Sequence, residues 1–130
     1  MADESLFNSR DALRLVAQEA CDYFNIKLAK SGGLNEALKI AAVAEAAGIP
    51  CMVGCMSETR LALTAAAHLA SARPIIRFLD LDSADMHAVD PVLGGMTYGQ
   101  GGRLALPEGP GLGAEPDPVF LKGLESFVVK

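Results

Sequence analysis

Three short apolar segments, spaced about 25 residues apart, constrain the fold of this chain most strongly. They start near positions 23, 51 and 75, and a stretch with helical periodicity lies between each one and the next. Strands separated by helices in this way predict parallel strands joined by right-handed crossovers. Apolar strands covered by helices are also what a buried parallel sheet requires. The sequence therefore predicts an α/β fold.

Periodicity, caps and helix breakers give the expected limits of each element. The expected helices span residues 10–20, 34–47 and 57–72, and the expected strands span residues 23–28, 51–56 and 75–82. Gly48 is the expected C-cap of the second helix, with Pro50 beyond it. In the first strand, Asn25 and Lys27 lie on the face opposite the apolar side chains, because side chains alternate along a strand.

The remainder of the chain has a different composition. Eight of the 13 glycines fall within residues 94–113, and five of the seven prolines fall within residues 91–118. Apolar residues still recur there, so we expect an ordered but irregular arm over residues 83–130. A short strand is expected at residues 103–106 and a short helix within residues 118–129.

Charge and length exclude several classes of protein. The net charge of −5 and the scattered basic residues argue against a nucleic-acid partner, and no apolar run approaches the roughly 18 residues of a membrane span. The first residues lack the features of a signal peptide, and three cysteines without CxxC spacing are typical of reduced thiols, so we expect a cytoplasmic protein. With 130 residues, the chain is too short for a closed (β/α)8 barrel, which needs about 250.

Polar residues stand where the expected strands end, which is where βα-repeat proteins carry their functional groups. They are Asp3-Glu4 ahead of the first helix, Lys27, and the pair Asp80 and Asp82. An exposed terminus, a surface lysine and a turn cap are the structural alternatives. A lysine whose pKa is lowered by burial or nearby cations can exchange a proton with carbon.

Four motifs in this order resemble the C-terminal half of the muconate lactonizing subgroup of the enolase superfamily, and most closely its dipeptide (L-Ala-D/L-Glu) epimerases. The motifs occupy residues 1–5, 24–33, 53–58 and 78–82, and residues 101–107 and 110–113 are similar to the C-terminal arm of the family. The resemblance implies that residues 1–82 form the last part of a (β/α)8 barrel, from the end of strand five to strand eight. Residues 83–130 would then form the arm, and Met1 corresponds to an internal position of strand five.

The resemblance also implies a role for each strand-end residue. Asp3 matches a carboxylate ligand of Mg²⁺, and Lys27 matches one of two lysines that remove and return the α-proton through an enediolate. Asp80 and Asp82 match the pair that holds the α-ammonium group of a dipeptide. Cys55 and Met56 match the lining of the substrate pocket, and Glu58 is a weaker candidate there. Hard carboxylate oxygens suit Mg²⁺.

The family also uses a capping domain, a second lysine and two further metal carboxylates, none of which can be placed in this sequence. We therefore expect a segment of a Mg²⁺-dependent epimerase that is inactive as an isolated chain. Open sheet edges pair with other chains, so we expect self-association or a complementary chain. A muconate cycloisomerase-like enzyme and a non-catalytic interaction module are the alternatives. The Asp80 and Asp82 pair favours an amino-acid substrate over the first of these, because it suits an ammonium group.

Overall fold

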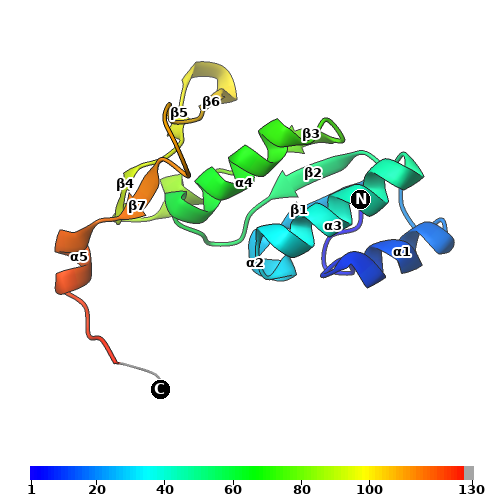
Figure 1. Cartoon of the computed structure of the whole chain (residues 1–130), viewed down its shortest axis with the longest axis horizontal. Helices are drawn as coiled ribbons and strands as arrows, with labels where there is room; N and C mark the ends of the chain where they lie inside the picture. Colours follow the sequence, from blue (N-terminus) through cyan, green and yellow to red (C-terminus); the bar gives the residue numbers. More distant parts are fainter. Residues whose placement is uncertain (128–130) are drawn as a thin grey trace.

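The computed structural model describes residues 1–127, and its centre is a three-stranded parallel sheet (Figure 1). The strands are β1 (Phe24–Lys27), β2 (Cys51–Gly54) and β3 (Ile76–Leu79), in the order β1-β2-β3. Ala2 forms a parallel bridge to Phe24, so the N-terminal residues extend the sheet beyond β1. The predicted α/β class and the parallel arrangement are confirmed.

The helices form where the Ala-rich periodic segments predicted them. The chain forms α1 (Ser9–Ala17), α2 (Leu28–Ser31), α3 (Leu34–Ala47) and α4 (Arg60–Ala72). The limits of α3 agree with the sequence, and Gly48 ends it in the left-handed region at φ 69°. The first helix was expected to run to residue 20 but ends at Ala17, and the helix expected to begin at residue 57 begins at Arg60. The short helix α2 was not predicted.

All three strands end earlier than the sequence indicated, β1 by one residue and the other two by more. We expected the second to reach Met56 and the third to reach Asp82, but β2 ends at Gly54 and β3 ends at Leu79. The amide of Asp80 makes the final contact between them, 3.0 Å from the carbonyl oxygen of Val53. A strand needs a partner for its hydrogen bonds, and Leu81 has none left along β2. Asp80 and Asp82 therefore follow the strand instead of forming its last positions.

One face of the sheet packs on the helices, and the other is open. Phe24, Ile26 and Val53 are fully buried against α3 and α4, as the alternation along β1 predicted. On the opposite face Phe78 is 46% exposed, and its ring meets that of Tyr23 edge-on with centroids 5.8 Å apart. This open face would line the interior of a complete barrel.

The rest of the chain forms the expected irregular arm. Its elements are η1 (Ser83–Met86), β4 (Val92–Gly94), β5 (Thr97–Tyr98), η2 (Gln100–Gly102), β6 (Leu104–Ala105), β7 (Ala114–Pro116) and α5 (Pro118–Lys122). β4 pairs antiparallel with β7, and β5 pairs antiparallel with β6. β6 and α5 fall where a strand and a helix were predicted, although residues 128 and 129 of the expected helix lie outside the described residues.

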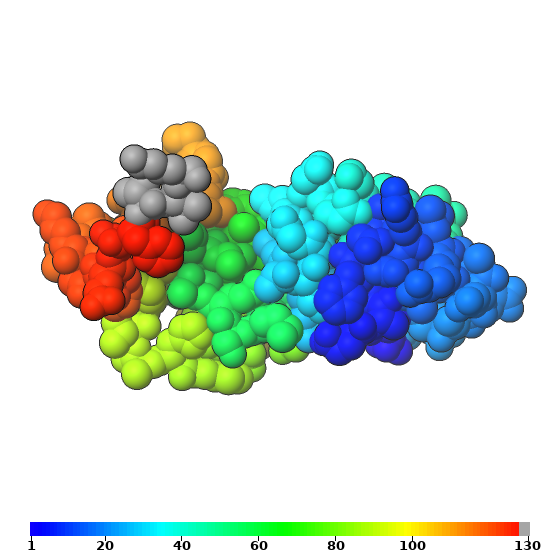
Figure 2. Space-filling view, turned by 90° about the horizontal axis from the view of Figure 1, so that it is seen from below, coloured from blue at the N-terminus to red at the C-terminus, as the bar shows by residue number. Residues whose placement is uncertain are grey.

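The molecule is elongated, with α1 near one end and α5 at the other (Figures 1 and 2). Among residues 1–127, no helix is both long enough and apolar enough to cross a bilayer.

Candidate active site

The candidate residues gather at one edge of the sheet because its strands are parallel. Ala2 accepts a hydrogen bond from the amide of Asn25 at 2.8 Å, and this contact places Asp3 beside the carboxyl end of β1. Lys27 is the last residue of β1, and Cys55 follows β2 directly. Asp80 follows β3, so all of these positions share the carboxyl edge.

Lys27 and Asp3 form the centre of this edge. Nζ of Lys27 lies 3.1 Å from Oδ2 of Asp3 and 3.7 Å from Oε1 of Glu4. Burial alone would lower the pKa of Lys27, but hydrogen bonds and charge attraction from Asp3 and Glu4 raise it above its ordinary value. The side chain is therefore an ammonium group at neutral pH. The lowered lysine pKa that proton abstraction requires is not present while the Asp3 carboxylate lies beside Lys27.

Asp3 is held by more donors than the sequence analysis identified. Nζ of Lys30 donates to its Oδ1 and to its backbone carbonyl oxygen, and Nδ2 of Asn25 donates to its Oδ2 at 3.1 Å. Burial would raise the pKa of Asp3, but Lys30 and Lys27 hold it below its usual range. The Lys27-x-x-Lys30 spacing was the available signal for the second lysine. Only the fold shows that both lysines reach one carboxylate.

Among the candidates for the pocket lining, Met56 lies close to Lys27, whereas the carboxylate of Glu58 is engaged in its own loop. Sδ of Met56 lies 3.9 Å from Nζ of Lys27, so the segment after β2 meets the end of β1. Glu58 uses its carboxylate within its own loop, where Oε2 accepts a hydrogen bond from the amide of Met56 at 3.0 Å. Its backbone is also tied to Ser83. Glu58 therefore stabilises a loop in this structure.

Asp80 and Asp82 are both exposed, with buried Leu81 between them. Sγ of Cys55 lies 4.0 Å from Oδ1 of Asp82. The hydroxyl of Tyr98, from the arm, donates to the carbonyl oxygen of Leu81 at 2.7 Å. The two carboxylates line a hollow of about 270 Å³ together with Tyr98. Exposed carboxylates beside a hollow can hold a cationic group.

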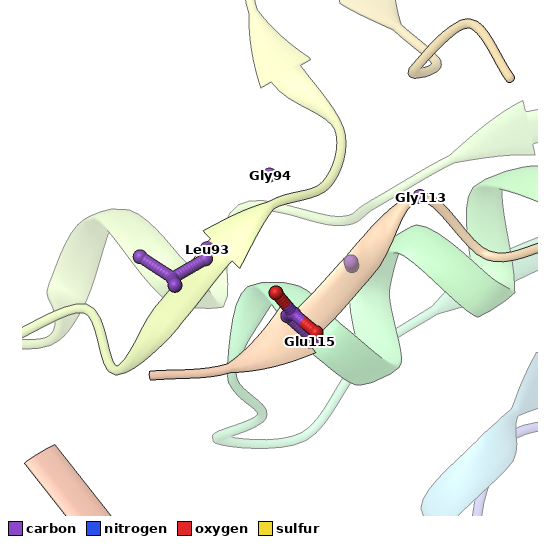
Figure 3. A pocket seen from close by; sticks show the side chains of 5 residues that line it. Leu93, Gly94, Gly113 and Glu115 are labelled. Atoms are coloured by element: carbon purple, nitrogen blue, oxygen red, sulfur yellow. The ribbon is translucent and has the colours of Figure 1, made fainter. Parts of the chain in front are cut away.

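A second hollow, of about 380 Å³, lies beside the paired strands β4 and β7 of the arm (Figure 3). Its lining includes Leu93, Gly94 and Gly113, and Glu115 is its one charged side chain. This hollow therefore places no cationic side chain beside its single carboxylate, whereas the sheet edge places Lys27 and Lys30 beside Asp3.

A metal ion would find only part of a site in these residues. Asp3 offers hard carboxylate oxygens of the kind that Mg²⁺ binds. Among residues 1–127, however, no group of three His, Cys, Asp or Glu side chains stands close enough together to hold an ion. The described residues therefore fit one ligand of a metal site and not a whole one.

These features define a part of a barrel with functional groups at the carboxyl ends of its strands, and comparison with known proteins identifies its family. Residues 1–119 match the model of the enolase C-terminal domain-like family, and the chain belongs to that family. Its relatives are dipeptide epimerases of the enolase superfamily.

The relatives are similar in both sequence and structure. An L-Ala-D/L-Glu epimerase of Clostridium acetobutylicum is 49% identical over 88% of this chain and 32% of its own. A D-Ala-D/L-Ala epimerase of Cytophaga hutchinsonii is 47% identical over 99% of this chain and 35% of its own. A solved structure of the dipeptide epimerase from Cytophaga hutchinsonii, complexed with Mg and the dipeptide D-Ala-L-Val, has a TM-score of 0.93 and 49% identity. It covers 96% of this chain, which in turn covers 34% of that protein. The chain thus spans about a third of the length of the relatives it matches.

Proposed function

We propose that this chain supplies the carboxyl-terminal part of the active site of a Mg²⁺-dependent dipeptide epimerase. The observation that carries the proposal is the contact of 3.1 Å between Lys27 and Asp3 at the carboxyl edge of the sheet. The family match of residues 1–119 and the identities of 47–49% to dipeptide epimerases support it.

Lys27 is the proposed proton-transfer group. In its neutral form, the amine would take the α-proton of a bound dipeptide and leave the electron pair on the substrate as an enediolate. In its ammonium form, Lys27 would return a proton to the face of the α-carbon that it meets. A single lysine serves only one face, so inversion needs a second acid or base on the other side. The described residues place no second free lysine at this edge, because Lys30 is bound to Asp3.

The other candidate residues would bind and orient the substrate. Asp3 would hold Mg²⁺, which would supply positive charge to the substrate carboxylate and offset the negative charge that raises the pKa of Lys27. Asp80 and Asp82 would hold the α-ammonium group, with Cys55 and Met56 lining the pocket. This ammonium clamp favours a dipeptide over a muconate-like substrate.

The isolated chain should not exchange the α-proton of its substrate, because it supplies only one metal ligand and because Asp3 and Glu4 raise the pKa of Lys27 above its ordinary value. The test incubates the 130-residue chain with L-Ala-L-Glu and Mg²⁺ in D₂O and follows the α-proton signals by NMR. We expect no exchange above that of a buffer blank. Exchange that disappears in Lys27→Ala would show that the chain is active alone and would contradict this part of the proposal.

The open face of the sheet is also a proposed contact surface, for a second copy or a complementary chain. Phe78, Leu79 and Tyr23 are exposed there or at the adjoining edge. Light scattering of the same sample should give a mass above the 13.6 kDa of one chain. A clean monomer at micromolar concentration would refute self-association.

A further inference from the structure

The surroundings of Lys30 distinguish it from its neighbour Lys27. Its side chain is only 5% exposed. Nζ of Lys30 has three acceptors, namely Oδ1 of Asp3, the carbonyl oxygen of Asp3 at 2.6 Å and the carbonyl oxygen of Asn25 at 3.5 Å. A lysine ammonium group carries three protons. Each proton of Lys30 therefore has an acceptor within the protein, and none is left for a substrate.

The three contacts of Lys27 are longer. It has one short contact, at 3.1 Å to Oδ2 of Asp3. Its other neighbours are Oε1 of Glu4 at 3.7 Å, on a side chain that is 66% exposed, and the weakly accepting sulfur of Met56 at 3.9 Å. Lys27 can therefore exchange its partners, whereas Lys30 cannot do so without leaving a buried charge unpaired.

The short helix α2 produces this division. Lys27 still has extended backbone angles, with φ −125° and ψ 126°, but the chain turns into α2 at the next residue. Continued as a strand, the chain would carry Lys30 about 10 Å beyond Lys27, at roughly 3.3 Å per residue. The helical turn instead returns Lys30 to the side of Asp3, and Gly32 in the left-handed region at φ 75° ends the helix.

Burial makes Lys30 depend on Asp3, because the side chain of Lys30 is only 5% exposed whereas that of Asp3 is 38% exposed. Removing Asp3 would leave the buried ammonium group of Lys30 without its charged partner, which is strongly unfavourable. Lys30 also binds both the side chain and the main chain of Asp3, and two points of attachment fix the direction of the carboxylate as well as its position.

We propose that Lys30 is a positioning residue that fixes the Asp3 carboxylate, and that this leaves Lys27 as the exchangeable ammonium group of the site. The inference rests on the proposed function for the role of Asp3 as a metal ligand. It adds that the two lysines of the Lys27-x-x-Lys30 motif have different roles, since Lys30 positions Asp3 and Lys27 remains able to exchange its partners.

Lysine side-chain NMR of the full chain, labelled with ¹⁵N and ¹³C, tests the inference without an activity assay. An ammonium group gives a persistent signal when its protons are hydrogen-bonded and shielded from exchange with water. We expect one such signal, correlated with the Cε of Lys30. It should be lost in Lys30→Met and in Asp3→Asn and kept in Lys27→Met. The control, Lys39→Met, changes an exposed lysine on α3 and should also keep the signal.

The Cγ resonance of Asp3 reports the positioning itself. It should shift or broaden in Lys30→Met and stay close to its original position in Lys39→Met. An unchanged Asp3 resonance in Lys30→Met would overturn the inference. If Lys30→Met does not fold, the spectrum of the unmodified protein still tests the inference. A persistent signal that belongs to Lys27, or no persistent signal at all, would overturn the positioning role of Lys30.

Addition of Mg²⁺ to a full-length epimerase in which this chain replaces the matching third separates this inference from the proposed function, because the isolated chain offers only one metal ligand. There, an Asp3 resonance that ignores Mg²⁺ would count against the metal-ligand role, whereas the persistent Lys30 signal of the isolated chain would still support the positioning role.

Discussion

Asn25 connects the candidate site to Gly54 on the neighbouring strand. Its side chain is buried, and Nδ2 donates to Oδ2 of Asp3. Its Oδ1 has no hydrogen-bond partner and faces Gly54 on the neighbouring strand. A Cβ atom at position 54 would lie 2.7 Å from that oxygen, so the site needs glycine there.

Gly54→Ala should therefore destabilise the protein by about 1–3 kcal/mol, the usual cost of overpacking a filled interior. Chemical denaturation followed by circular dichroism measures the change. The matched control is the same substitution in an Asn25→Ala background, where the obstructing oxygen is absent and the cost should be much smaller. An equal cost in both backgrounds would show that the contact with Asn25 is not the reason.

Single residues show how far the sequence could predict the site. Asp3 and Lys27 belong to motifs with a family resemblance, and the fold brings them together. Lys30 carries an equally polar side chain, but its role depends on a four-residue helix that is too short for a periodic signal. Alternation along β1 places Asn25 on the face opposite Phe24, but it does not predict that the amide of Asn25 is buried.

At the scale of elements, Arg60 joins α4 to the arm. Its guanidinium group donates to the carbonyl oxygens of Val92 at 2.9 Å, Gly94 at 2.8 Å and Met96 at 3.1 Å, and it pairs with Asp90. Few other side chains could satisfy four acceptors, since a guanidinium has five donors in a rigid planar fork.

Arg60→Lys should loosen the arm although the charge is kept, because an ammonium group cannot reproduce the planar fork. The lost hydrogen bonds are worth about 2 kcal/mol, so amide exchange at Gly95 and Met96 should accelerate roughly 30-fold. Arg77→Lys, at an exposed position on β3, is the control. Unchanged protection at Gly95 in Arg60→Lys would show that other contacts hold the arm.

Helices were easier to predict than the ends of strands. The interval from Leu34 to Ala47 has a periodic face and a glycine stop, and both are local signals. The end of β3 depends instead on where β2 ends, because Leu81 loses its partner when the neighbouring strand stops at Gly54. The pattern of β3 alone does not show where its neighbour stops.

At the scale of the whole molecule, parallel strands explain why residues more than 70 positions apart share one edge. Lys27 ends β1, Asp80 follows β3, and Asp3 follows the bridge that Ala2 forms beside β1. All three residues therefore lie at the carboxyl edge of the sheet. The same arrangement leaves one face of the sheet uncovered, which fits a chain that matches about a third of each relative's length. We therefore propose that this edge is one part of a larger active site.

The most direct test replaces the matching third of the Cytophaga hutchinsonii epimerase with this chain and measures epimerisation of D-Ala-L-Ala. We expect the chimera to be active and Lys27→Ala to lower its kcat at least about 100-fold, as loss of a proton-transfer group does. Lys39→Ala should retain the activity, and circular dichroism should confirm that both variants are folded. A folded Lys27→Ala chimera that works as fast as its parent would contradict the account.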